Sequence, residues 1–140
     1  MRIEILDVLD NAEEPQGPRI AFRSPLGQAW ARWCGSGTPR GGDAVDVEID
    51  IPDDVVHWVP AEGPDALLAE AAEAPVRIKG AVVAAAEDAV VSIRLGTDIL
   101  LVEFATAGHP DEQDRPPDRP SIGNRIELSV PHIDVYPYSV

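Results

Sequence analysis

Residues 45–51 alternate strictly between aliphatic and acidic side chains (VDVEIDI). Successive side chains of a β-strand point to opposite faces, so this pattern places four aliphatic side chains on one face and three carboxylates on the other. Residues 126–130 (IELSV) repeat the alternation near the C-terminus. Both segments are therefore predicted to be half-buried strands.

Each of these strands follows a turn of the same type, at residues 39–43 (PRGGD) and 120–124 (PSIGN). In both turns a glycine precedes Asp or Asn, which suits a tight turn with a positive φ. The preceding strands and glycine turns also correspond approximately, which indicates an internal duplication. We predict an all-β fold of two pseudo-repeated five-strand halves, residues 1–60 and 76–140, forming a barrel or a sandwich. Their last strands are expected near residues 55–59 and 133–138.

The connector between the halves, residues 61–75, is rich in helix-forming residues. From Pro64 to Pro75 it reads PDALLAEAAEAP, with Asp65 as a candidate N-cap and Pro75 as a stop signal. Leucine and alanine would give such a helix one apolar side. We therefore predict one short helix between the two halves.

The charge balance limits the classes of partner. The chain has 140 residues, with 11 basic and 25 acidic side chains and a formal net charge of -14. This charge repels nucleic-acid backbones and anionic membrane surfaces, so nucleic-acid binding is disfavoured. No segment approaches the roughly 20 consecutive apolar residues of a membrane-spanning helix. The single cysteine, Cys34, and an N-terminus without the features of a leader indicate a cytoplasmic protein.

The acidic residues are most concentrated from position 43 to position 54, where no basic residue intervenes. The run comprises Asp43, Asp46, Glu48, Asp50, Asp53 and Asp54. Carboxylates spaced about 7 Å apart along one strand face would complement a row of Lys or Arg on a basic protein. The alternative is an ordinary solvated strand face. The corresponding segment of the second half, 125–130, is not comparably acidic.

Aromatic residues supply further candidates for a binding surface. Trp30 and Trp33 have opposite parity on one predicted strand, so we expect Trp33 to face the core and Trp30 to face outward. Trp58 is the third candidate, because Trp is over-represented among residues that dominate binding energy. We assign Trp30 and Trp58 to the partner-binding set with the acidic run.

Signals for catalysis or for a cofactor are missing from the sequence. None of the serines lies in a G-x-S-x-G motif, and Cys34 has no evident base beside it. The three histidines lack zinc-ligand spacing, and a straight strand splays carboxylates away from a common calcium position. We therefore expect a non-enzymatic protein without metal or cofactor.

Two resemblances to known families add expectations about fold and function. The glycine turns and the entry into the fourth strand of each half resemble those of OB-folds and related small barrels. The residues that carry this resemblance are Gly27, Gly42, Asp43, Val45, Val47 and Ile49 in the first half and Gly96, Gly123, Asn124, Ile126, Leu128 and Val130 in the second. An OB-fold usually has a helix between strands three and four, where this chain has a Gly/Ser/Pro loop. In size and charge the chain is similar to bacterial toxin-immunity proteins, which implies a basic toxin as partner.

These observations lead to one functional hypothesis and its alternatives. The hypothesis is a non-catalytic protein-binding module, an immunity-type or antitoxin-like inhibitor whose acidic strand face engages a basic partner. The main alternative is a structural or accessory β-barrel subunit of a larger assembly, with self-association through Trp30, Trp58, Tyr136 and Tyr138. A small enzyme and a single-strand nucleic-acid binder are less favoured readings.

Overall fold

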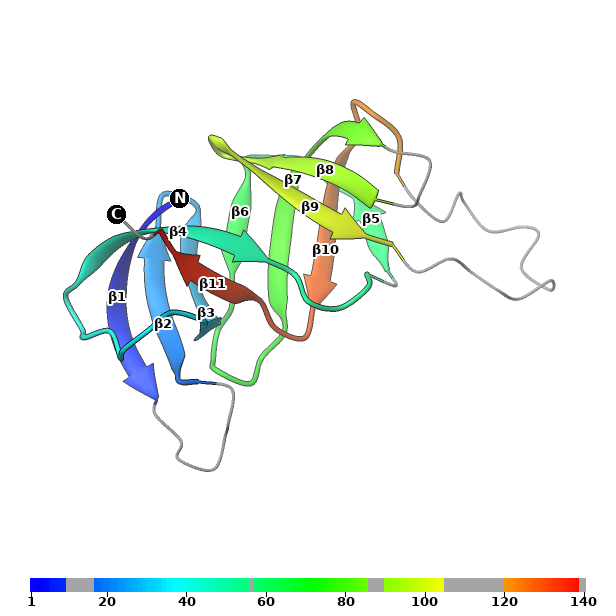
Figure 1. Cartoon of the computed structure of the whole chain (residues 1–140). Coiled ribbons are helices and arrows are strands. Elements are labelled where there is room, and N and C mark those ends of the chain that lie inside the picture. Colours follow the sequence, from blue (N-terminus) through cyan, green and yellow to red (C-terminus); the bar gives the residue numbers. More distant parts are fainter. Residues whose placement is uncertain (10–16, 56, 86–89, 105–119, 139–140) are drawn as a thin grey trace.

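The computed structural model describes residues 1–9, 17–55, 57–85, 90–104 and 120–138, and it is all-β over these residues (Figure 1). The strands are β1 Arg2–Leu9, β2 Arg19–Ser24, β3 Gly27–Trp33, β4 Ala44–Asp50, β5 Trp58–Pro60, β6 Ala66–Leu68, β7 Val76–Ala85, β8 Val90–Leu95, β9 Asp98–Glu103, β10 Arg125–Val130 and β11 Asp134–Pro137. The predicted strands at 45–51 and 126–130 are confirmed as β4 and β10, each within one residue at either end.

Two units share these strands. The first is a closed five-strand barrel in the order β1-β2-β3-β11-β4, in which β11 runs parallel to β3 and antiparallel to β4. The second is an antiparallel six-strand sheet in the order β5-β10-β7-β8-β9, with β6 also paired to β7. The all-β prediction is confirmed, and the barrel has the size of an OB-fold. The second unit is a sheet and not a second closed barrel.

The last predicted strands cross between the units. The C-terminal strand β11 completes the barrel, whose other strands all come from residues 1–50. Conversely, β5 pairs with β10, and Val55 forms an isolated parallel bridge with Phe104 at the end of β9. Val55, Phe104 and Val135 belong to a single hydrophobic core that contains residues of both units. The barrel and the sheet are therefore held together by shared burial as well as by the exchanged strands.

The same turn contacts occur in both units. Ile5 N–H donates to the Asp43 carbonyl over 2.8 Å, and Val82 N–H donates to the Asn124 carbonyl over the same distance. A β-bulge follows each donor along its strand. The glycine before each acceptor has a φ near +95°, as the predicted P-x-x-G-[DN] turn requires. These matched contacts relate β1 to β7 and β4 to β10.

The predicted helix at 64–75 is wrong, because no helix occurs in the part of the chain that the structure describes. Residues 66–68 instead form β6, and the Leu67 side chain is fully buried. The N–H of Leu67 donates to the Leu26 carbonyl, and that of Ala69 donates to the Gln28 carbonyl, each over 3.1 Å. Helix propensity is worth only tenths of a kcal/mol per residue, so burial of one leucine outweighs it.

Asp65, expected to cap that helix, joins three segments instead. Its carboxylate accepts hydrogen bonds from Gly96 N–H and from the Arg125 guanidinium, each over 2.9 Å. Burial opposes ionisation of this carboxyl, but the two hydrogen bonds and the Arg125 charge outweigh it and hold the pKa of Asp65 below its usual value of 3.8. The residue therefore ties the connector to the β8–β9 turn and to β10.

Candidate functional site

Strand β4 passes alongside β9 where the barrel meets the sheet (Figure 1), and residues of both strands line a groove between them. It consists of three adjoining cavities of about 200, 360 and 350 Å³. The middle cavity is lined by Glu48, Ile49, Asp50, Ile99, Leu101 and Tyr136. It shares Glu48, Ile49 and Ile99 with the first cavity and Asp50 and Leu101 with the third. We call this feature the β4–β9 groove.

The rim of the groove is acidic on both sides. Its carboxylates are Glu48 and Asp50 on β4, Asp53 and Asp54 just after it, and Asp98 and Glu103 on β9. Among the described residues, no Lys, Arg or His side chain lines any of the three cavities. The N-terminal ammonium of Met1, which lines the first cavity, pairs with Asp98 over 3.2 Å. The other carboxylates lie close together without an interleaved Lys or Arg and produce a negative potential that a groove concentrates.

Apolar side chains stand exposed beside these carboxylates. Ile99 is 56% exposed and Leu101 is 62% exposed, on the outward face of β9. Tyr136 and Tyr138 of the C-terminal segment are exposed as well. The neighbouring Cys34, followed by burial, raises the pKa of Tyr136 above its usual value of 10, so the phenol is uncharged at neutral pH. The groove therefore offers neutral apolar surface between acidic edges.

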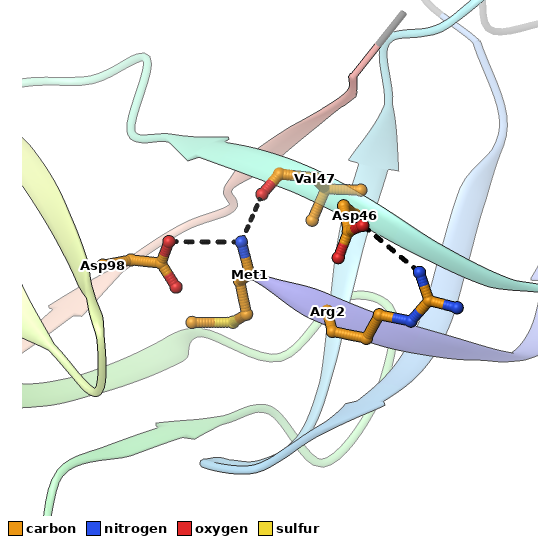
Figure 2. A network of polar contacts seen from close by, with 5 residues as sticks. All are labelled: Met1, Arg2, Asp46, Val47 and Asp98. Atoms are coloured by element: carbon orange, nitrogen blue, oxygen red, sulfur yellow. Dashed lines mark hydrogen bonds and ion pairs between the residues drawn. The ribbon is translucent and has the colours of Figure 1, made fainter. Parts of the chain in front are cut away.

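The structure divides the predicted acidic run. Glu48, Asp50, Asp53 and Asp54 come together in the β4–β9 groove. Asp46 lies on the same face of β4 but forms an ion pair with Arg2 over 3.2 Å (Figure 2). Asp43 lies in the preceding turn, where its carboxylate accepts the Arg40 N–H over 3.0 Å. Asp53 is also 3.7 Å from His132, which completes an ion pair when that imidazole is protonated.

The predicted tryptophans lie away from the groove. Trp33 is buried with Ala29 and Ala31, so the predicted parity of β3 is confirmed, and Trp30 is half-buried opposite Ala21 of β2. Trp58 is half-buried on β5 and packs against the core. Neither Trp30 nor Trp58 lines one of the three cavities. The aromatic residues of the groove are instead the two tyrosines of the C-terminal segment.

Sequence reasoning missed the contribution of β9 to the groove. Residues 98–103 (DILLVE) place an acidic residue at each end and two exposed aliphatics between them. The available signal was the run of four consecutive aliphatic residues, which exceeds what a strand with one buried face requires. That signal shows excess apolar surface, but it cannot show that the surface adjoins β4.

One charged pair near the groove is internally compensated. Asp134 on β11 is 1% exposed, and its carboxylate accepts a hydrogen bond from Arg32 of β3 over 2.7 Å. Because this ion pair is neutral as a unit, it adds little to the negative potential from Asp50, its neighbour across the strands. The pair contributes instead to the contact of β11 with β3.

The described residues contain neither a group of three His, Cys, Asp or Glu placed to hold a metal ion nor a helix long and apolar enough to cross a membrane. No protein-family model, curated protein or solved structure matches this chain. Functional inference for this protein therefore depends on the geometry and the chemistry of the β4–β9 groove.

Proposed function

We propose that this protein is a non-catalytic binding module, of the immunity or antitoxin kind, that engages a basic protein through the β4–β9 groove. The observation that carries the proposal is the combination of uncompensated carboxylates with exposed aliphatic side chains in one concave surface. A solvated strand face accounts for the carboxylates alone, but it does not account for Ile99 and Leu101 beside them.

The chemistry of the groove specifies the partner. Its carboxylates would pair with Lys or Arg and accelerate association, whereas the apolar residues would supply contacts that salt does not screen. The corresponding strand of the sheet, β10, has no comparable acidic face. Its outward side chains include Glu127 and Ser129 where β4 has Asp46 and Glu48. A basic partner should therefore recognise only this side of the protein.

A pair of matched charge variants tests this function. Glu48→Gln with Asp50→Asn removes two charges from the groove, and Glu70→Gln with Glu73→Gln removes two from the exposed segment before β7. A basic partner, identified first by affinity capture or from the neighbouring genes, is titrated by calorimetry at several salt concentrations. The groove variant should bind at least about tenfold more weakly and with a shallower salt dependence.

The control variant should bind like the unmodified protein, because it has the same net charge as the groove variant. Equal weakening by both variants would show that net charge, and not the groove, attracts the partner. Unchanged binding by both would remove the β4–β9 groove from the interface altogether.

Exposure of Tyr136 and Tyr138 favours the second candidate, an accessory subunit that associates with itself or with another assembly. Such apolar association should be insensitive to salt. Light scattering at low and high salt tests self-association, because a monomer under both conditions would exclude it and a salt-insensitive oligomer would favour the second function.

A further inference from the structure

The edges of β3 and β9 are covered differently, although the two strands hold corresponding places. Each follows a two-residue hairpin turn, with Ser24 paired to Gly27 in the barrel and Leu95 paired to Asp98 in the sheet. The β3 edge is covered by β6, through the hydrogen bonds to the carbonyls of Leu26 and Gln28. Within the described ranges, no strand pairs with the corresponding edge of β9, Thr97–Leu101.

The correspondence also holds for the second strand that β6 contacts. In the sheet, β6 pairs with β7 at Ile78, which is itself paired with Leu128 of β10. In the barrel, Met1 occupies the place of Ile78. Its nitrogen donates to the Val47 carbonyl over 2.8 Å (Figure 2), and its carbonyl accepts the Val47 N–H over the same distance. These two hydrogen bonds extend the β1–β4 ladder by one pair, in the same way as the Ile78–Leu128 pair belongs to the β7–β10 ladder.

A cavity lies where the counterpart of β6 would be. Its lining includes Met1, Thr97 and Ile99, which correspond to Ile78, Leu26 and Gln28, three of the residues that β6 pairs with or hydrogen-bonds to. The cavity volume is about 200 Å³, several times the roughly 30 Å³ share of one water molecule. It therefore has room for an aliphatic side chain, as the site filled by Leu67 does.

From this arrangement we infer that the basic partner of the proposed function binds by strand addition. An extended segment of that partner pairs with the Thr97–Leu101 edge of β9 and places an aliphatic side chain in the adjoining cavity, as Leu67 does beside β3. The inference depends on the proposed function for the identity of the occupant. Exposed strand edges with an adjacent pocket are a recurring means of peptide recognition.

One difference between the two sites specifies the chemistry of the segment. Next to β6 stands Gly27, where a Cβ atom would come within 2.4 Å of the Leu68 side chain. Its counterpart in the open site is Asp98, whose carboxylate contacts the Met1 nitrogen over 3.2 Å (Figure 2). That carboxylate is already ion-paired with the N-terminal ammonium of Met1. The preference for Lys or Arg in the segment therefore rests on Glu48, a carboxylate of the same cavity without an ion pair among the described contacts.

A second copy of this chain is a poor occupant. Its own β6 carries leucine at the position facing Asp98, and two copies with a net charge of -14 each repel one another. A basic segment with alternating aliphatic and cationic residues satisfies both the cavity and the rim.

Synthetic peptides test the strand geometry directly. The probe is Lys-Ala-Leu-Lys-Ala-Lys, which keeps the Ala-Leu-x-Ala pattern of residues 66–69 and replaces its second leucine by lysine. In the register of β6, the N–H groups of the probe's leucine and of its second alanine donate to β9. A second peptide is N-methylated at these two positions, and a third only at the central lysine, whose N–H points to the opposite side.

Binding is measured by calorimetry to the full chain and to the Glu48→Gln, Asp50→Asn variant. Strand addition predicts that the third peptide binds within about threefold of the probe, whereas the doubly methylated peptide binds at least about thirtyfold more weakly. The amide resonances of Ile99 and Leu101 should shift with the probe and not with the doubly methylated peptide.

Two other outcomes overturn the inference and remain distinguishable from failure of the proposed function. Equal binding of all three peptides, weakened in the charge variant, would retain an acidic docking groove and exclude strand addition. A probe that binds to neither protein would exclude this edge as a peptide site, while the titration with the captured basic partner would still decide the proposed function.

Discussion

Strands β3 and β9 hold the same position in two units of one chain, and yet their outer edges have different surroundings. The chain covers the first with β6, whose Leu67 is fully buried, and leaves the second beside a cavity with exposed Ile99 and Leu101. The comparison separates two uses of the same architecture. A covered edge stabilises the fold, whereas an open edge with acidic borders is available to a partner.

Leu67→Ala should give the largest effect on folding, because it removes a buried side chain from the covered edge. We expect a loss of about 3 kcal/mol in the free energy of unfolding, measured by denaturant titration. Leu101→Ala is the matched control on the open edge, where the side chain is 62% exposed, and it should change stability by no more than about 0.5 kcal/mol. Similar losses from the two variants would contradict the distinction between the edges.

Asp65→Asn should have an intermediate effect, because Asp65 joins the covered edge to the β8–β9 turn. Removing its charge weakens the contacts with Arg125 and Gly96 and should cost about 1 to 2 kcal/mol near pH 7. The folded protein lowers the pKa of this carboxyl below 3.8, so its contribution is present above that pH and is lost as the pH falls through the lower value.

Unfolding of the wild type and of Asp65→Asn is therefore compared from pH 7 to pH 2. The stability difference should be constant near neutrality and shrink below about pH 4, where the wild-type carboxyl begins to be protonated in the unfolded chain. Glu70→Gln, at an exposed position, serves as the control and should show no such dependence. A difference that grows on acidification would contradict the assigned hydrogen bonds.

Asp46→Asn should have the smallest effect. Asp46 and Arg2 are both more than half exposed, so their ion pair should contribute about 0.5 kcal/mol or less and should weaken further in salt. Glu48→Gln, which has no ion pair among the described contacts, should leave stability unchanged. Thermal unfolding at low and high salt checks both. A clear loss in Glu48→Gln would mean that the acidic rim stabilises the fold, which would weaken its interpretation as a docking surface.

Local patterns along the chain predicted much of the fold. Alternation at 45–51 and 126–130 identified β4 and β10, and the parity of Trp30 and Trp33 identified the buried face of β3. Four of the six predicted acidic residues also line the groove. The predictions of the strands and of the buried face succeeded because strand periodicity and turn chemistry depend on residues close together in sequence.

The missed features depend on partners far away in sequence. Ala66–Leu68 has the composition of a helix, but it is a strand because its leucine fills a site between β3 and β7. The acidic character of 43–54 is likewise visible in the sequence, whereas the cation beside Asp46 and the aliphatics beside Asp50 come from Arg2 and from β9.

The sequence by itself determined most of the strands, the glycine turns before β4 and β10 and the excess of negative charge, because each depends on the chemistry of neighbouring residues. Only the tertiary structure decided that β5 and β11 cross between the units, that β6 covers one edge and that its counterpart on β9 stays open in the described chain. Which edge is covered depends on pairing and burial between distant segments, and no local pattern encodes the position of a segment relative to another strand.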